Sequence, residues 1–175
     1  ARDLRDNQAV HEVRLSELFE DGKDTLILIN TMFAPGADRP CPMCNALADG
    51  YNANAPHVSD RVNFALVTRA PIQKLRDWAA RRGWRDIRLL SSFKSSFNRD
   101  YRAETADDEQ WPSITVFRRD ADGTIRHFYS VEGQTLETPE GQDGRMLDPY
   151  WPLWNLLDLT PEGRGSDWYP RYSYD

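Results

Sequence analysis

Pro40-Cys41-Pro42-Met43-Cys44-Asn45 contains both cysteines of this 175-residue chain. An apolar run at residues 25–33 precedes this stretch across a short loop, and a run with helical character at residues 44–54 follows it. A buried strand, a loop, a C-x-x-C motif and a helix in this order are typical of a thioredoxin-like arrangement. The stretch therefore predicts both the fold class and the reactive residues.

The two cysteines are expected to differ in reactivity. If Cys41 caps the helix, its sulfur faces backbone N–H groups that lack helical partners and the positive end of the helix dipole. Both favour the thiolate, which is the nucleophile, and Pro42 suits the first helical position because no N–H is needed there. Cys44 then lies one turn into the helix, within reach of a mixed disulfide on Cys41. We therefore expect Cys41 to attack a disulfide and Cys44 to resolve it.

A C-x-x-C pair can also form half of a metal site or a lone stabilising disulfide. A zinc site would normally add a second C-x-x-C or an H-x-x-x-H, and the sequence has neither, so we expect no cofactor. The alternative is a copper(I) or other soft-metal protein, in which Cys41 and Cys44 bind the metal together with His57 or His127. A third reading is a non-catalytic interaction module built on the aromatic C-terminus.

Strand and helix patterns alternate along the chain and predict an α/β fold with a central mixed sheet flanked by helices. An Asp120-Ala-Asp-Gly123 turn suits a hairpin between the last two strands. The strands are expected to be parallel at residues 25–32, 63–68 and 87–90, and antiparallel at 113–119 and 124–130.

The helix after the cysteines is expected to end at Pro56-His57, and a second helix to run from Pro71 to Gly83. A helical turn is expected at residues 15–19, and a further helix at residues 151–159.

Three residues near the end of the predicted strands are candidates for substrate binding. Pro112 directly precedes the strand 113–119, where thioredoxin-like folds place a cis-proline that faces the dithiol; an ordinary trans proline at a strand start is the alternative. A cis bond there would leave a backbone edge free to pair with an extended substrate, and Trp111 precedes it. Arg69 follows the strand 63–68, at the edge that faces the ligand crevice in open α/β sheets, where it could bind an anionic group.

Composition limits the expected partners. The net charge of −6 and the sequence pI near 5.1 argue against a nucleic-acid surface, and no apolar run reaches membrane-spanning length. Two cysteines at redox spacing do not suggest a secreted disulfide scaffold, so a cytoplasmic location is expected. The expected partner is a protein or small-molecule thiol or disulfide, with a homodimer as an open alternative.

The chain is expected to divide into an N-terminal arm with a short helix (1–24), a core (25–131) and a C-terminal extension (132–175). The extension is unusually aromatic, and each buried aromatic side chain contributes about 1.5–3 kcal/mol. We therefore expect it to pack on the core, or across a dimer interface, and to wall the pocket beside the dithiol. Its aromatic residues include Trp151, Trp154, Trp168, Tyr169 and Tyr172.

Peroxiredoxins need a threonine three residues before the peroxidatic cysteine, where it orders the peroxide. Here Asp38 lies three residues before Cys41, and Cys41 itself lies three residues before Cys44. The peroxide-reducing class therefore loses its specific support.

Together these pieces resemble the bacterial "domain of unknown function 899" family, described as thioredoxin-like predicted dithiol–disulfide oxidoreductases. The resemblance implies a thioredoxin-like fold and a redox dithiol, and it brings no substrate with it. The chain differs from the best-known thioredoxins, because no tryptophan precedes Cys41 and Pro42 takes the first intervening position. The matching pieces are Cys41-Pro-Met-Cys44, Asp49-Gly50 with His57, Val67-Thr-Arg-Ala-Pro71, Gly83-Trp84, Ser91-Ser92, Phe97-Asn98, Pro112-Ser-Ile-Thr-Val-Phe117 and Leu157-Asp-Leu-Thr-Pro161.

Overall fold

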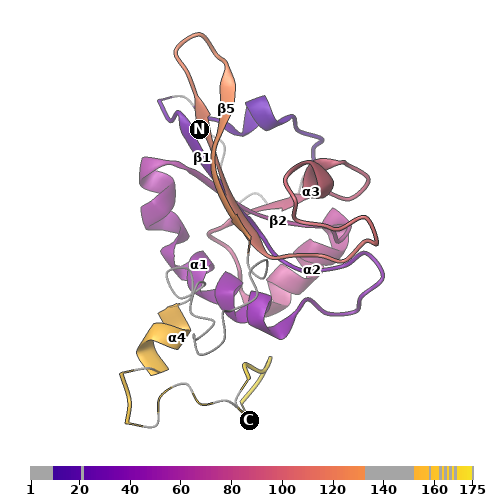
Figure 1. Cartoon of the computed structure of the whole chain (residues 1–175), viewed down its shortest axis with the longest axis vertical. Helices are drawn as coiled ribbons and strands as arrows, with labels where there is room; N and C mark the ends of the chain where they lie inside the picture. The colour runs from indigo at the N-terminus through magenta and orange to yellow at the C-terminus, as the bar shows by residue number, and fades with distance from the viewer. Residues whose placement is uncertain are drawn as a thin grey trace, which may run out of the picture.

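A computed structural model describes residues 10–20, 22–132, 152–157, 159–161, 163, 165, 167 and 169–174. Within these residues, five strands form one mixed sheet in the order β3-β2-β1-β4-β5 (Figure 1). The strands are β1 (Thr25–Asn30), β2 (Asn63–Thr68), β3 (Arg88–Ser91), β4 (Ser113–Arg119) and β5 (Ile125–Glu132).

β1 lies at the centre of the sheet. It pairs in parallel with β2, and β2 pairs in parallel with β3. On its other side β1 pairs antiparallel with β4, which forms the antiparallel hairpin with β5. All six residues of β2 are buried, as the apolar composition of a strand covered on both faces predicts. The predicted strand directions are confirmed, and the topology is that of a thioredoxin-like α/β fold.

The helices of the described residues include two long ones, α1 and α2, and three short ones. Gly83 ends α2 with a φ of 76°, a left-handed conformation that glycine adopts without steric cost. The predicted end of this helix is therefore confirmed. The helices are η1 (Leu15–Leu18, a 3-10 turn), α1 (Pro42–Arg61), α2 (Ile72–Arg82), α3 (Phe97–Asp100) and α4 (Pro152–Leu157).

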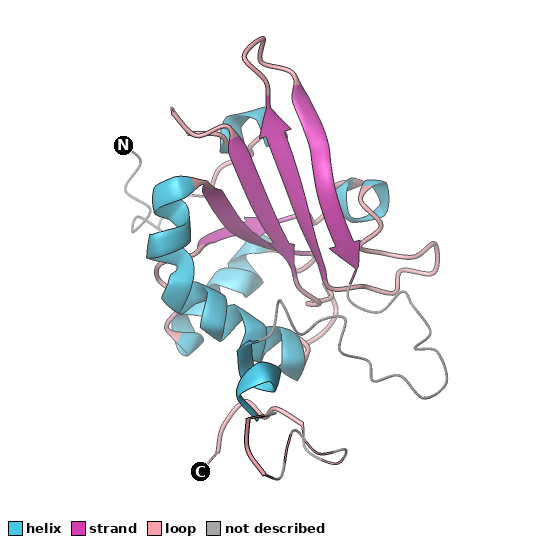
Figure 2. Ribbon diagram, turned by 60° about the vertical axis from the view of Figure 1, so that its left-hand side comes forward, coloured by secondary structure: helices cyan, strands magenta, loops and turns pink. Residues whose placement is uncertain are grey.

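Helices flank the sheet (Figure 2), and two clusters of buried apolar side chains pack between the helices and the strands. On one face, Leu47 and Ala48 of α1 and Leu75 of α2 pack with Ile29 and Leu66 of the central strands. On the other face, Leu18 of η1 and Phe97 of α3 pack with Phe117 of β4 and with buried residues of β1 and β2. Helices therefore lie on both faces of the sheet, as predicted.

One helix prediction was wrong. α1 does not end at Pro56 but continues to Arg61 with the proline inside it. A proline removes one helical hydrogen bond, but Ala55 on one side of it is fully buried and Val58 on the other packs against the core. Packing of these side chains therefore outweighs the local signal. The short helix α3 lies in residues 91–101, where the sequence pattern indicates no helix.

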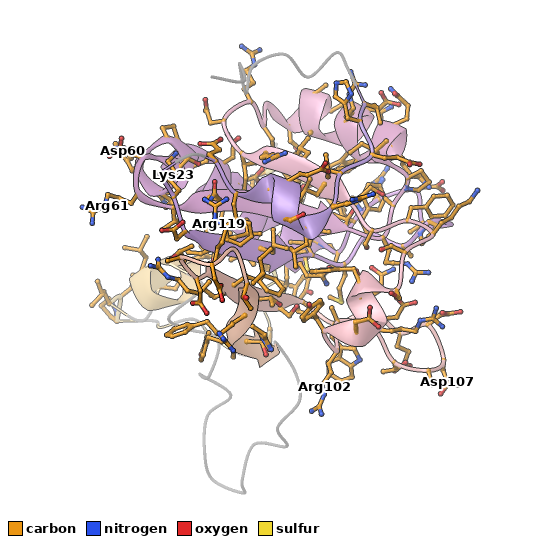
Figure 3. The ribbon with its side chains drawn as sticks, turned by 90° about the horizontal axis from the view of Figure 1, so that it is seen from above. Lys23, Asp60, Arg61, Arg102, Asp107 and Arg119 are labelled. Atoms are coloured by element: carbon orange, nitrogen blue, oxygen red, sulfur yellow. The ribbon has the colours of Figure 1, made fainter. Side chains whose placement is uncertain are left out.

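Charged side chains anchor the chain before β1 to neighbouring elements (Figure 3). Lys23 Nζ donates hydrogen bonds to Glu20 Oε2 at 2.9 Å and to the Ser59 carbonyl of α1 at 2.5 Å. Arg119, at the end of β4, pairs with Asp24 Oδ1 at 3.2 Å. No helix in the described part of the chain is long and apolar enough to cross a lipid bilayer.

Leu66→Ala should lower the free energy of unfolding by about 2–5 kcal/mol, because Leu66 is 0% exposed in the centre of the core. Leu159→Ala is the matched control, since Leu159 is 82% exposed and surface truncations usually change stability by less than about 0.5 kcal/mol. Urea denaturation of both variants measures the two values. Equal effects would contradict the packing described for β2.

Candidate dithiol site

Cys41 occupies the N-cap position of α1, as the sequence predicts. Its carbonyl accepts the first helical hydrogen bond from Asn45 N at 2.9 Å, and Pro42 follows at the first helical position. Its own N–H donates to the Met32 carbonyl at 3.0 Å, which ties the helix start to the residues just after β1. The Cys41 side chain is half-buried and makes no side-chain N-cap hydrogen bond.

Cys44 lies one turn into α1 and is only 1% exposed. The Met32 N–H donates a hydrogen bond to Cys44 Sγ across 3.4 Å. Both cysteines are free thiols in this structure. The motif therefore presents one accessible sulfur and one enclosed sulfur at the end of the central strand.

The pKa of Cys41 is lowered from 9.0 to about 5. The largest cause is the hydrogen bond that the Cys44 thiol donates to the Cys41 sulfur, and backbone N–H groups of Cys44 and Met43 and the Tyr169 hydroxyl act in the same direction. Partial burial opposes them, because it disfavours the charged form. Cys41 is therefore mainly thiolate at neutral pH.

The pKa of Cys44 is raised well above its usual value. The hydrogen bond with Cys41 is the largest cause, followed by burial and by the negative charge on Cys41. The Met32 N–H works against these causes because it favours a thiolate at Cys44. The two sulfurs thus share one proton, which stays on the buried partner.

The end of the chain lies beside the dithiol. The Tyr169 hydroxyl is 3.8 Å from Cys41 Sγ, and the Tyr172 hydroxyl donates to the Pro40 carbonyl. Figure 1 shows this C-terminal segment at the end of the molecule where α1 begins. Trp151, Trp168 and the side chain of Trp154 lie outside the described residues, so the packing of the whole extension 132–175 and the domain boundaries stay predictions.

A hydrogen-bonded network braces α1 against α2 just behind the cysteines. Asp49 accepts hydrogen bonds from Arg82 Nη2 at 2.5 Å and from Trp84 Nε1 at 2.6 Å. Asn45 Nδ2 donates to Asp49 at 3.2 Å, and Trp78 Nε1 donates to Asn45 Oδ1 at 2.9 Å. Sequence reasoning assigned no role to Asn45, Asp49 or Arg82. Asp49 and Trp84 do occur among the pieces of the family resemblance, which is the one signal that could have drawn attention to them.

The cis peptide bond predicted before Pro112 is wrong, because the structure contains no cis peptide bond among its described residues. Both backbone groups of Trp111 are already paired in the trans form. Its N–H donates to the Ala103 carbonyl at 3.0 Å, and its carbonyl accepts from Asn30 Nδ2 at 2.8 Å. Pro112 is buried and Trp111 is half-buried beside the end of β1. The role of Trp111 and Pro112 in substrate binding stays a prediction.

Arg69 follows β2 at the expected edge of the sheet, but its guanidinium forms an ion pair with the buried carboxylate of Glu104. Burial is the first cause that raises the pKa of Glu104, followed by a hydrogen bond with Asp108, while the charge of Arg69 lowers it. Arg69 therefore already has an anionic partner within the chain. Binding of a substrate anion would have to compete with this pair.

The structure does not gather the residues of the metal alternative. His57 is exposed on α1, and His127 is exposed on β5 with its ring 5.6 Å from that of Tyr101. Among the described residues, no three His, Cys, Asp or Glu side chains group in a way that could hold a metal ion. Copper(I) binding remains an untested prediction.

A family model described as "Bacterial protein of unknown function (DUF899)" matches residues 7–174. No protein with a curated record matches the sequence.

Solved structures with a similar fold include a secreted Mycobacterium tuberculosis disulfide oxidoreductase homologous to E. coli DsbE. It is 18% identical, with a TM-score of 0.43 over 74% of this chain and 81% of that one. Peroxiredoxin Q of Xanthomonas campestris is 12% identical, with a TM-score of 0.47 over 62% and 68% of the two chains. Peroxidoxin BcpB of Mycobacterium tuberculosis is 19% identical, with a TM-score of 0.47 over 69% and 73%.

Alkylation of the reduced protein should modify Cys41 first, with a half-maximal rate near pH 5. Cys44→Ala should raise this midpoint, because it removes the thiol that donates to Cys41 Sγ. Cys44→Ser should raise it less, because a serine hydroxyl can still donate. Rates measured between pH 4 and 9, with mass spectrometry to locate the label, give the three midpoints. Earlier labelling of Cys44, or a wild-type midpoint near 9, would contradict the geometry.

The reduced protein should also gain stability as the pH rises from 5 to 9. The Cys41 pKa is depressed in the folded state, so its contribution is present above the unfolded value and is lost as the pH falls through about 5. The raised pKa of Cys44 acts only above the ordinary value of 9.0, outside this window. Denaturation of the reduced wild type and of Cys41→Ser between pH 5 and 9 measures how the free energy of unfolding changes with pH. Parallel curves for the two proteins would contradict the prediction.

Proposed function

The chain belongs to the DUF899 family of bacterial proteins, and we propose that it is a thiol–disulfide oxidoreductase whose reactive pair is Cys41 and Cys44. Cys41 is the nucleophile, and Cys44 is the resolving thiol. The proposed substrate is a protein or small-molecule disulfide or dithiol. The reaction needs no resident cofactor, because both electrons are carried by the two sulfurs.

The asymmetry between the two sulfurs is the observation that carries this proposal. A nucleophile must be accessible and deprotonated, and Cys41 is half-buried with a pKa lowered to about 5. A resolving thiol must be close to the first sulfur yet shielded from other reactants, and Cys44 is 1% exposed with its thiol hydrogen-bonded to Cys41. An inert structural pair would not require this difference.

The proposed reaction has two exchange steps. The Cys41 thiolate attacks one sulfur of a substrate disulfide, so that a Cys41–substrate disulfide forms and the other substrate sulfur leaves as a thiolate. Cys44 then loses its proton to solvent or to the departing thiolate, and its sulfur attacks Cys41 Sγ. The Cys41–Cys44 disulfide forms and the second substrate sulfur leaves. The substrate gains two electrons and the dithiol loses two, and the reverse sequence oxidises a substrate dithiol.

Residues around the end of β1 are the proposed contacts of the substrate. Trp111 and Pro112 directly follow Gln110 in the chain. The Gln110 side-chain oxygen, Oε1, accepts a hydrogen bond from the Phe33 N–H at 3.1 Å. Phe33 directly follows Met32, whose N–H donates to Cys44 Sγ. This proximity supports Trp111 and Pro112 as one wall of the substrate site. Arg69 is a weaker candidate because of its pair with Glu104. A cytoplasmic location and action as a monomer or homodimer belong to the proposal as well.

The two cysteine variants should behave differently with a chromogenic aromatic disulfide. Reduced wild type should release two aromatic thiolates per chain, and Cys44→Ser should release one and retain a mixed disulfide, detectable by its mass. Cys41→Ser should react roughly 100-fold more slowly at pH 7, because its remaining thiol is buried and protonated. Full reactivity of both variants would reverse the assignment.

Turnover needs a second measurement, because any thiolate reacts with an aromatic disulfide. Wild type should accelerate the reduction of insulin disulfides by dithiothreitol, and Cys41→Ser should not. A wild-type rate equal to that of dithiothreitol alone would contradict the proposed function.

A further inference from the structure

We infer that Tyr169 is a positioning residue of the dithiol, and that its hydroxyl donates a hydrogen bond to the Cys41 thiolate of the reduced protein. The inference rests on the proposed function, in which Cys41 is the nucleophile. It adds the C-terminal segment, 128 residues away in sequence, to the machinery that sets the reactivity of this sulfur.

The contact between Tyr169 and Cys41 fixes the direction of the hydrogen bond. The oxygen–sulfur distance is 3.8 Å, within the range for hydrogen bonds to sulfur. A thiolate has no proton and can only accept, so the phenol must donate. Cys41 is only half-buried beside the Tyr169 ring, so part of its surroundings is open to a reactant.

The Tyr172 anchor holds Tyr169 in this place. Three residues after Tyr169, the Tyr172 hydroxyl donates to the Pro40 carbonyl, directly before Cys41. The Tyr172 carbonyl accepts a hydrogen bond from Arg82 Nη1 at 2.7 Å, and its ring meets that of Trp78 edge-on with centroids 5.5 Å apart. These contacts come from the loop before α1 and from α2, so they fix the segment at two sides of the site.

The anchor continues into the brace between the helices. Arg82, which holds the Tyr172 carbonyl, also pairs with Asp49 on α1. Trp78, which meets the Tyr172 ring, donates to Asn45 in the first turn of the same helix. The segment is therefore attached to the elements that also hold Cys41 and Cys44.

Among the described residues, the ionisable groups that act on the Cys41 sulfur are Cys44 on α1 and Tyr169 in the C-terminal segment. Tyr172 feels the charge of Cys41, and the Arg39 guanidinium lies 5.6 Å from the centre of the Tyr172 ring. Burial, and then the charge of Cys41 and the hydrogen bond with it, raise the pKa of Tyr169 above its usual value. Tyr169 thus keeps its proton across the physiological range. It acts as a hydrogen-bond donor and not as an acid that protonates a leaving thiolate.

Loss of this hydrogen bond should have opposite effects at low and high pH. Below the midpoint, fewer Cys41 side chains are thiolate and the reaction slows. Above it, each thiolate is more basic and therefore more nucleophilic, with a Brønsted coefficient of about 0.4–0.5. For a pKa rise of one unit, the rate on the alkaline plateau increases roughly threefold. A role limited to packing would not produce such a crossing of the two pH profiles.

Tyr169→Phe in the full chain tests the inference, with Tyr174→Phe as the matched control. Tyr174 belongs to the same segment, but its hydroxyl accepts the Arg171 N–H. The readouts are the thiolate absorbance and the rate of Cys41 alkylation by iodoacetamide from pH 4 to 9, together with the melting temperature. We expect an upward midpoint shift of about 0.5–1 unit and a two- to threefold faster plateau in Tyr169→Phe, and wild-type profiles in Tyr174→Phe.

Tyr172→Phe provides an independent variant, because it keeps the Tyr169 hydroxyl in the chain but removes the bond to the Pro40 carbonyl that helps to hold Tyr169 beside Cys41. It should shift the midpoint in the same direction by a smaller amount. A wild-type midpoint in Tyr169→Phe, or an equal shift in Tyr174→Phe, would overturn the inference.

These titrations do not depend on turnover, so the two proposals can fail separately. If the midpoint shifts while the wild type reduces no disulfide, Tyr169 has the inferred contact and the proposed function is wrong. If turnover is normal and the Tyr169→Phe midpoint is unchanged, the oxidoreductase stands and the inference is wrong.

Discussion

The backbone of Met32 holds both cysteines, and the geometry of the dithiol depends on it. The Met32 carbonyl accepts the Cys41 N–H at 3.0 Å, and the Met32 N–H donates to Cys44 Sγ across 3.4 Å. Met32 follows β1 by two residues, and β1 is the central strand of the sheet, paired with β2 on one side and with β4 on the other. A shift in the pairing of β1 would therefore move both sulfurs. The fixed centre of the sheet explains how the segment between β1 and α1 holds Cys41 and Cys44 in a defined relation.

The fold separates two chemically identical side chains by giving them different surroundings. At the helix start, Cys41 meets N–H and S–H donors on one side and remains half-open on the other, and hydrogen bonding outweighs burial in setting its pKa. One turn further, Cys44 meets Cys41 and the packed interior, and the backbone N–H groups of Met32 and of Cys44 itself favour its charged form. A single turn of helix therefore separates an accessible sulfur with a lowered pKa from a buried sulfur with a raised pKa.

The sequence predicted the features that depend on local pattern and missed those that depend on distant partners. The buried strands, the hairpin turn and the capping position of Cys41 are each readable within about ten residues. The helix that continues past Pro56 depends on how Ala55 and Val58 pack, and the role of Arg69 depends on Glu104, 35 residues later. No local pattern could connect Tyr169 with Cys41. The wrong isomer at Pro112 came from analogy with the fold, whereas the trans form is the one in which both backbone groups of Trp111 pair with Asn30 and Ala103.

The hydrogen bond and the charge interaction between Cys41 and Cys44 also explain how the second exchange step of the proposed reaction would begin. In the reduced protein, the hydrogen bond to Cys41 and the charge on Cys41 are two of the three causes that raise the pKa of Cys44. Once Cys41 forms a mixed disulfide, its sulfur carries no charge and accepts the Cys44 proton only weakly. Burial then remains as the cause that raises the pKa, and the Met32 N–H still favours the thiolate. The first exchange thus lowers the pKa of Cys44 at the moment when Cys44 must lose its proton. In the proposed reaction, the order of the two steps would follow from electrostatics within the dithiol, and solvent or the departing thiolate would take the Cys44 proton.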